Sequence, residues 1–336
     1  MSDILHIPPS QGPGEQPAPP PAGDPELSKL EPAAAPAEQE AAVEAPVPER
    51  QLEVDADLAA AWVQEETDPE LQQVRQRIVD SIDCVSFDTF RAALHTTAEQ
   101  LQETLQGQHY AMLWDSKPHS SKRWVSQLLA PDIAANPPAA QTFFTSGWER
   151  MNGCPTVERL VAQGLTTFVV PDDAIYSGEQ IIQRSVRPIY ELTHTPEFRQ
   201  RYPDAHIKMV ITAPYMSSRF LESNIVKALT AEGFIEIVPP AHIMPTLTER
   251  LTSEEQAILA KHEGRLTPDG DVFYQAPTTV FDHRIPDGHS FPDEVRGVFA
   301  STPQKPYDLP GTPYYAAEEQ LFETYKAPLL QQLNQR

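Results

Sequence analysis

The segment Phe168–Gln180, F-V-V-P-D-D-A-I-Y-S-G-E-Q, decides which fold the sequence predicts. Its first residues, Phe168 to Val170, are apolar and mostly β-branched, which is typical of a buried strand in a parallel sheet. Two carboxylates, Asp172 and Asp173, come next, and Ser177-Gly178 then forms a turn of small residues. The residues expected on the inner face of the following helix recur at helical spacing, namely Ile181, Ile182, Ser185, Val186 and Ile189. The segment therefore predicts a strand, a turn and a helix.

This unit carries the groups that a phosphosugar site needs. Ligands of open α/β sheets bind at the carboxyl ends of strands. Gly178 allows the backbone to approach a ligand closely, and the first amides of the following helix attract an anion. Asp172 and Asp173 would accept hydrogen bonds from hydroxyl groups or hold Mg²⁺ through water. A ribose 5-phosphate combines these features. The alternative is structural, because an acidic pair at a strand end also caps the next helix.

The segment resembles the signature of type I phosphoribosyltransferases: four apolar residues, an acidic pair, two apolar residues and then Thr/Ser-Gly-x-Thr. Asp172 and Asp173 match the acidic pair, which in that family contacts the ribose hydroxyls, and Ile175 matches an apolar position. The resemblance implies that five residues form the 5-phosphate loop: Tyr176, Ser177, Gly178, Glu179 and Gln180. More loosely, the chain is similar to the phosphoribosyltransferase-like proteins of bacterial conflict and effector systems.

Three positions depart from the family pattern. Pro171 replaces the last apolar residue of the strand, and Gln180 replaces the usual hydroxyl residue, which puts one phosphate contact in doubt. Tyr176 stands where purine-type enzymes carry an acidic general base. Because a phenol has a pKa of about 10, it is a poor base at neutral pH. We therefore expect the substrate not to be a 6-oxopurine.

A basic loop follows the first predicted core strand. The stretch D-S-K-P-H-S-S-K-R, residues 115–123, gathers cationic and hydroxyl side chains in front of a predicted helix. Such a loop is a natural site for a polyanion. In the family, the corresponding loop binds pyrophosphate. The ligand-binding candidates are Lys117, Ser120, Ser121, Lys122 and Arg123. The alternative is a charged loop that faces only solvent.

A late polar cluster spans the end of the last predicted strand and the loop after it. Asp282, His283 and Arg284 lie there, with Asp287 and His289 close behind. The resemblance implies that this segment lies beside the nucleobase, so Asp282 is a further ligand-binding candidate. Zn²⁺ or Fe²⁺ binding is an alternative, but the spacing supplies no evident third ligand, and a structural turn is favoured over it.

The composition excludes several classes of function. The chain has 48 acidic and 25 basic residues, a formal charge of −23, which argues against general binding to nucleic acid or anionic membranes. No apolar run reaches the roughly 18 residues of a membrane helix, and the first residues lack the pattern of a signal peptide. The only cysteines, Cys84 and Cys154, are widely spaced, which favours a reducing cytoplasm.

Three regions are predicted. Twelve of the first 50 residues are proline, and the region is strongly acidic. We therefore expect residues 1–52 to be a disordered tail, either a solubilising segment or a segment for secretion or for docking a protein partner. Residues 53–107 predict a helical cap. Residues 108–336 predict an α/β domain, a three-layer α/β/α arrangement with a mostly parallel sheet of roughly five strands. The predicted strands are 109–114, 166–171, 206–212, 234–238 and 278–284, with an irregular connection over 131–154.

The leading prediction is a phosphoribosyltransferase-like enzyme. As the resemblance implies, it would bind 5-phosphoribosyl pyrophosphate and Mg²⁺ and transfer a phosphoribosyl group to a nitrogen acceptor. Asp172 and Asp173 would orient the ribose as the catalytic pair and hold the metal through water. The main alternative is a relative without catalysis that binds a nucleotide or phosphosugar as a regulatory or effector protein. A third is a hydrolase or nucleotidyl-type enzyme that uses the aspartate pair for metal.

Overall fold

The structure is a computed structural model that describes residues 51–115, 120–144, 155–261, 276–286, 293–301 and 303. Almost all of the predicted acidic tail, residues 1–52, lies outside these ranges, as does Lys117 of the basic loop. In the part of the chain that is described, no helix is long and apolar enough to cross a membrane.

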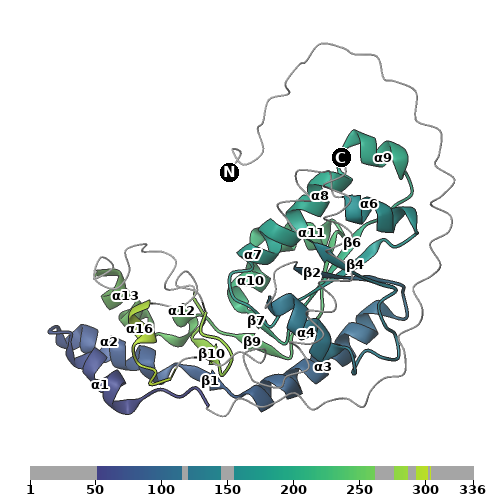
Figure 1. Ribbon diagram of the computed structural model, residues 1–336. Helices are drawn as coiled ribbons and strands as arrows, with labels where there is room; N and C mark the ends of the chain where they lie inside the picture. Colours follow the sequence, from purple (N-terminus) through teal and green to yellow (C-terminus); the bar gives the residue numbers. More distant parts are fainter. Residues whose placement is uncertain are drawn as a thin grey trace, which may run out of the picture. The chain divides into compact units, whose positions relative to one another are not determined.

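The main sheet has five parallel strands. They are β2 (Ala111–Asp115), β3 (Ala140–Phe144), β4 (Thr167–Pro171), β6 (Lys208–Thr212) and β8 (Ile235–Ile237). Their order across the sheet is β3-β2-β4-β6-β8, so the first strand, β2, lies inside the sheet, the second, β3, lies at one edge, and the later strands continue to the other edge. Figure 1 labels three of these neighbours, β2, β4 and β6. The prediction of an α/β fold with a mostly parallel sheet is therefore confirmed.

Three of these strands stop and then resume. After β4, β6 and β8 the chain forms the short strands β5 (Ala174–Ile175), β7 (Tyr215–Ser217) and β9 (His242–Met244), which pair in parallel as a second sheet in the order β5-β7-β9. The three strands of the second sheet thus continue the chain segments of three main-sheet strands. The interruption of β4 falls on Asp172 and Asp173, because these residues lie between β4 and β5.

Helices make up most of the remaining described chain. Their bounds are α1 Ala56–Gln64, α2 Pro69–Asp80, α3 Phe87–Leu105, α4 Ser121–Leu129, α6 Pro155–Ala162, α7 Glu179–Ile181, the π-helix η2 Ile182–Val186, α8 Arg187–Thr193, α9 Pro196–Arg201, α10 Ser218–Glu222, α11 Asn224–Ala231, α12 Leu247–Arg250, α13 Ser253–Lys261 and α16 Asp293–Arg296. Asp68 is the N-cap of α2 and Ser86 is the N-cap of α3, since both side chains accept a helix N–H.

Alternate residues of the buried strands enter two hydrophobic clusters. Val169 and Val210 pack with α3 and α4, whereas Phe168 and Val170 pack with α6 and α8. This alternation follows from the two-residue period of a strand, and it explains why the central strands are apolar throughout. A third cluster joins α1, α2 and α13 with Val280.

Besides the strands of the second sheet, two strands arise where the sequence pattern did not predict them. Within the predicted helical cap, β1 (Asp83–Val85) pairs in parallel with β10 (Thr279–Phe281), so the last predicted strand belongs to this two-stranded sheet instead of the main one. Within the predicted irregular connection 131–154, β3 pairs with β2. Both are short and depend on partners distant in sequence, which is why local periodicity does not reveal them.

Candidate functional site

A small cavity lies at the interrupted end of β4. Its volume is about 50 Å³, enough for a few water molecules or a group of similar size. The lining residues are Asp172, Ala174, Ile175, Tyr176, Ser177, Gly178, Gln180, Ile181 and Arg284. Most of the predicted 5-phosphate loop thus surrounds one cavity. Glu179, which is exposed, is not among the lining residues, and its N–H donates to Ser177 Oγ at 3.3 Å.

The position of this cavity agrees with the topology of the sheet. In chain order the main strands are arranged 2-1-3-4-5, so the direction of winding reverses between β2 and β4. In open parallel sheets, ligands bind at the carboxyl ends of the strands beside such a switch point. Asp172 and Asp173 follow β4, and the predicted basic loop follows β2. The two segments are brought together there.

Asp172 is buried at the edge of this cavity. Its Oδ1 accepts hydrogen bonds from the Ser121 hydroxyl and from the Asp173 N–H, the latter at 3.0 Å. Burial, and then the neighbouring charge of Asp173, raise the pKa of Asp172 to about 7. Lys122 and Arg284 oppose this shift. Asp172 is therefore the carboxyl group of the site whose protonation changes near neutral pH.

Asp173 is held more tightly. Its Oδ1 accepts from Arg284 Nη1 at 2.6 Å and from the Ala174 N–H at 2.9 Å, and its Oδ2 lies 3.5 Å from His283 Nε2. Burial alone would raise its pKa, but the Arg284 guanidinium and His283 outweigh burial and keep the pKa of Asp173 well below its usual range. Asp173 is the permanent anion of the pair.

The basic loop contributes through the start of α4. Ser120 precedes the helix, Ser121 bonds to Asp172, and Lys122 is buried and donates to Ser185 Oγ of η2 at 2.8 Å. Arg123 is also buried, with 3% of its surface exposed. Lys122 therefore links α4 to the helix that follows the cavity. Its positive charge reaches Asp172, whose pKa it lowers.

Gly178 is required by the geometry of the loop. Its φ is +71°, a conformation that side chains disfavour, and an added Cβ would lie 2.0 Å from Cδ2 of Phe220. The Ser217 hydroxyl, which accepts the Phe220 N–H at 3.0 Å, donates to the Tyr176 carbonyl. The loop is thus fixed against α10 by a close contact and a hydrogen bond.

Two predicted ligand residues make contacts within the protein. The Tyr176 hydroxyl donates to the Thr279 carbonyl of β10 at 3.2 Å, and its ring lines the cavity. Both carboxylate oxygens of Asp282 accept backbone N–H groups, from Leu52 at 2.7 Å and from Phe87 at 2.9 Å. Asp282 is buried and does not line the cavity, so the structure does not bring it together with the other candidates.

Arg284 and His283 belong to the site, although only their neighbour Asp282 was a sequence candidate. Arg284 lines the cavity, and its guanidinium carbon lies 5.6 Å from the centre of the Tyr176 ring. They follow β10, more than one hundred residues after the motif. The group of polar residues around the end of that strand was the one sequence signal for Arg284 and His283, and it did not indicate Asp173 as their partner.

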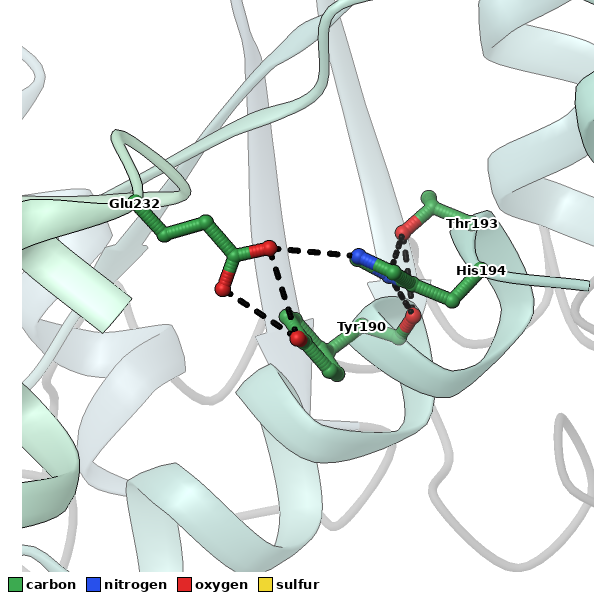
Figure 2. A network of polar contacts seen from close by, with 4 residues as sticks. All are labelled: Tyr190, Thr193, His194 and Glu232. Carbon is green, nitrogen blue, oxygen red and sulfur yellow. Dashed lines mark hydrogen bonds and ion pairs between the residues drawn. The ribbon is translucent and has the colours of Figure 1, made fainter. Parts of the chain in front are cut away.

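A second polar network lies at the opposite ends of the strands from the cavity. Tyr190 and Glu232 bond through the tyrosine hydroxyl at 3.1 Å, and His194 Nε2 lies 3.2 Å from Glu232 (Figure 2). The Tyr190 and His194 rings stack at 3.9 Å, and His194 Nδ1 lies 2.7 Å from the Tyr190 carbonyl. Because Glu232 precedes β8, this network is at the amino ends of the strands. It joins α8 to the end of α11.

The described residues contain no group of three or more His, Cys, Asp or Glu side chains that would hold a metal ion. The polar residues that line the cavity are Asp172, Tyr176, Ser177, Gln180 and Arg284, and the Ser121 hydroxyl contacts Asp172. Comparison of the chain with protein-family models, with curated proteins and with solved structures finds no match.

Proposed function

We propose that the protein is a phosphoribosyltransferase-like enzyme. It binds 5-phosphoribosyl pyrophosphate, or a related phosphosugar or nucleotide, and transfers a phosphoribosyl group to a nitrogen acceptor that is not a 6-oxopurine. The proposal includes the three-layer arrangement of that fold, supported by the two hydrophobic clusters on alternate residues of β4. A cytoplasmic location rests on the cysteine content alone.

One observation carries the proposal. Asp172 and the Ser177-Gly178 turn line the same cavity at the switch point of a parallel sheet, and Ser121 of the basic loop bonds directly to Asp172. Sites at this position bind phosphate-bearing ligands in many α/β proteins. Lys122 and Arg284 supply positive charge near the acidic pair. This combination suits a ligand that carries anionic groups and hydroxyl groups a short distance apart.

The residues of the cavity fit Mg²⁺ only in a limited way. Mg²⁺ keeps several waters and is bound through one or two carboxylates together with substrate phosphates. Asp172 would hold the water shell of an ion that arrives with the diphosphate, because Asp173 is already paired with Arg284. Mg²⁺ supplies neutralisation of the leaving diphosphate when bound. Asp172 would orient the sugar, and the loop at Gly178 would fix the 5-phosphate.

A second function, binding without catalysis, is favoured by two of these contacts. The Tyr176 hydroxyl is bonded to Thr279, and Asp173 is paired with Arg284 and His283, so neither group is poised to remove a proton from an acceptor. A protein with this site would recognise a phosphosugar or nucleotide as a signal. The same ligand distinguishes the two functions, because only the enzyme releases diphosphate.

The test is calorimetric titration of 5-phosphoribosyl pyrophosphate into the full chain, with and without Mg²⁺. We expect saturable binding that requires Mg²⁺ and that weakens about 10- to 100-fold in Asp172→Asn, since a hydrogen bond to a charged group contributes about 1.5–3 kcal/mol. Tyr190→Phe is the matched control, because Tyr190 belongs to the network of Figure 2 at the amino ends of the strands, and this variant should bind like the wild type.

Turnover is then assayed as diphosphate release with a panel of nitrogenous bases. Release with one acceptor supports the enzyme, whereas binding without release by any acceptor supports the second function. If folded wild-type protein binds neither this compound nor ribose 5-phosphate, the proposal is wrong.

A further inference from the structure

The two adjacent aspartates make different kinds of contact. The oxygens of Asp173 face groups of the protein: Arg284 and the Ala174 N–H on Oδ1, and His283 on Oδ2. Asp173 is 2% exposed and is not among the residues that line the cavity. Asp172 does line the cavity. Sequence alone treats the two as an equivalent pair, but their surroundings are unlike.

The partners of Asp173 are themselves fixed. The His283 ring lies in an aromatic enclosure, with ring centroids at 4.6 Å from Phe90, 5.1 Å from Trp124 and 5.2 Å from Phe281. His283 is 2% exposed. Arg284 lies over the Tyr176 ring while its Nη1 contacts Asp173. A ligand that took Asp173 from these groups would break an ion pair whose carboxylate is buried, which is strongly unfavourable.

Asp172 has limited capacity for a ligand. Its Oδ1 already accepts two hydrogen bonds, from Ser121 and from the Asp173 N–H. A carboxylate has about four acceptor positions. Besides these two bonds, a side-chain hydrogen bond joins the carboxyl groups of Asp172 and Asp173, so about one position is left to meet a sugar hydroxyl. One remaining acceptor position orients one ring hydroxyl but not two neighbouring ones.

We infer that the acidic pair is divided in function: Asp173 is an internal anion bound to Arg284 and His283, and Asp172 alone accepts a hydroxyl group of the ligand. This inference rests on the proposed function for the identity of the ligand, a pentose 5-phosphate. It adds a specificity: the site requires one of the two neighbouring ring hydroxyls and tolerates loss of the other.

The first arm of the test uses the wild-type chain with ribose 5-phosphate, 2-deoxyribose 5-phosphate and 3-deoxyribose 5-phosphate. We expect one deoxy sugar to bind within about threefold of ribose 5-phosphate and the other to bind about tenfold or more weakly. If both deoxy sugars lose about tenfold, two hydroxyls are accepted and the inference is wrong. Equal binding of all three sugars would equally contradict it.

The second arm compares variants by titration with ribose 5-phosphate. Asp172→Asn should weaken binding about tenfold or more, and Asp173→Asn by less than about threefold, at a temperature where both are folded. An equal loss in the two variants would overturn the division. If Asp173→Asn fails to fold, the first arm still decides the matter, because it needs no variant.

The third arm measures urea unfolding of Asp173→Asn, Arg284→Gln and the double variant. We expect the two changes to be coupled by about tenfold or more in the unfolding equilibrium constant, because the residues act as a pair. Additive effects would contradict the internal role of Asp173. Absence of any sugar binding by the wild type would overturn the proposed function and the ligand role of Asp172, whereas this third arm would still test the pairing of Asp173.

Discussion

At the scale of single residues, the carboxyl group of Asp172 is enclosed where little water can stabilise its charge. Its pKa of about 7 in the native state lies above the value of about 3.9 in an unfolded chain. Between these values the native protein holds a proton that the unfolded chain has lost. The stability that this group contributes is therefore complete below about pH 4 and is lost as the pH rises through about 7.

Asp172→Asn should remove this dependence. We expect the free energy of unfolding of the wild type, relative to the variant, to fall by about 1.4 kcal/mol per pH unit between about pH 4 and 7. Urea unfolding in the presence of a chelator, at pH 5, 6, 7 and 8, measures the difference. Asp173 acts in another window, since its lowered pKa makes its contribution disappear only below about pH 4. Parallel pH profiles for the two proteins would show that Asp172 ionises normally.

Gly178 gives a second test with an internal control. Gly178→Ala places a Cβ against Phe220, whereas Gly233, with φ +78°, has no atom within 4 Å of such a Cβ. We expect Gly233→Ala to lower the free energy of unfolding by about 1–2 kcal/mol, from the left-handed backbone alone. Gly178→Ala should cost about 1–3 kcal/mol more through the clash. Adding Phe220→Leu should restore part of that difference.

Equal costs for the two glycine variants in urea unfolding would mean that the loop at residues 176–180 shifts away from Phe220 without resistance.

The sequence identified the need for a glycine at 178 from its place in a turn. It did not identify Phe220, because a contact across forty residues leaves no local pattern. The same reason hid Arg284 and His283, whose pairing with Asp173 depends on where β10 lies.

At the scale of secondary-structure elements, the long and strongly periodic segments were predictable. The bounds of α2 and α3 follow from caps at Asp68 and Ser86 and from apolar residues at helical spacing. Strands β4 and β6 follow from their apolar runs. The strands β1 and β3 were missed, and so was the resumption of β4, β6 and β8 as a second sheet, because these strands are specified by their partners, which are distant in sequence.

The junction between β10 and the N-terminal helices can be tested at Asp282. Its carboxylate accepts the N–H groups of Leu52 and Phe87. Asp282→Ala leaves both donors without this acceptor, and we expect a loss of about 2–5 kcal/mol in the free energy of unfolding, since each buried unmet group costs about 1–3 kcal/mol. Asp204→Ala, at an exposed aspartate, is the control and should change stability by less than about 0.5 kcal/mol.

Ligand titration of the Asp282→Ala protein separates two roles. Affinity like that of the wild type, per folded molecule, would assign Asp282 to folding. A large loss of affinity without a loss of stability would instead support the ligand contact that the family resemblance implies.

At the scale of the whole molecule, the formal charge of −23 is the dominant electrostatic feature. Self-repulsion of this size destabilises a compact state, and salt screens it because the Debye length falls from about 30 Å at 0.01 M to about 10 Å at 0.1 M. We therefore expect the melting temperature, measured by calorimetry, to rise between 10 and 200 mM sodium chloride by roughly 2–4 °C for about 1 kcal/mol. A fall over this range would show that attractive ion pairs outweigh the net repulsion.

The interruption shared by β4, β6 and β8 determines what substitutions at residues 172 and 173 would do to the stability of the protein and to its cavity. Residues 172 and 173 stand where an ordinary sheet would simply continue, and their side chains accept the N–H groups of the residues after them. Two β-branched residues in their place would favour one unbroken strand from β4 into β5. We expect this variant to be more stable and to lose its polar cavity. Such a trade between stability and a binding site is expected wherever a local rule of folding is violated for function.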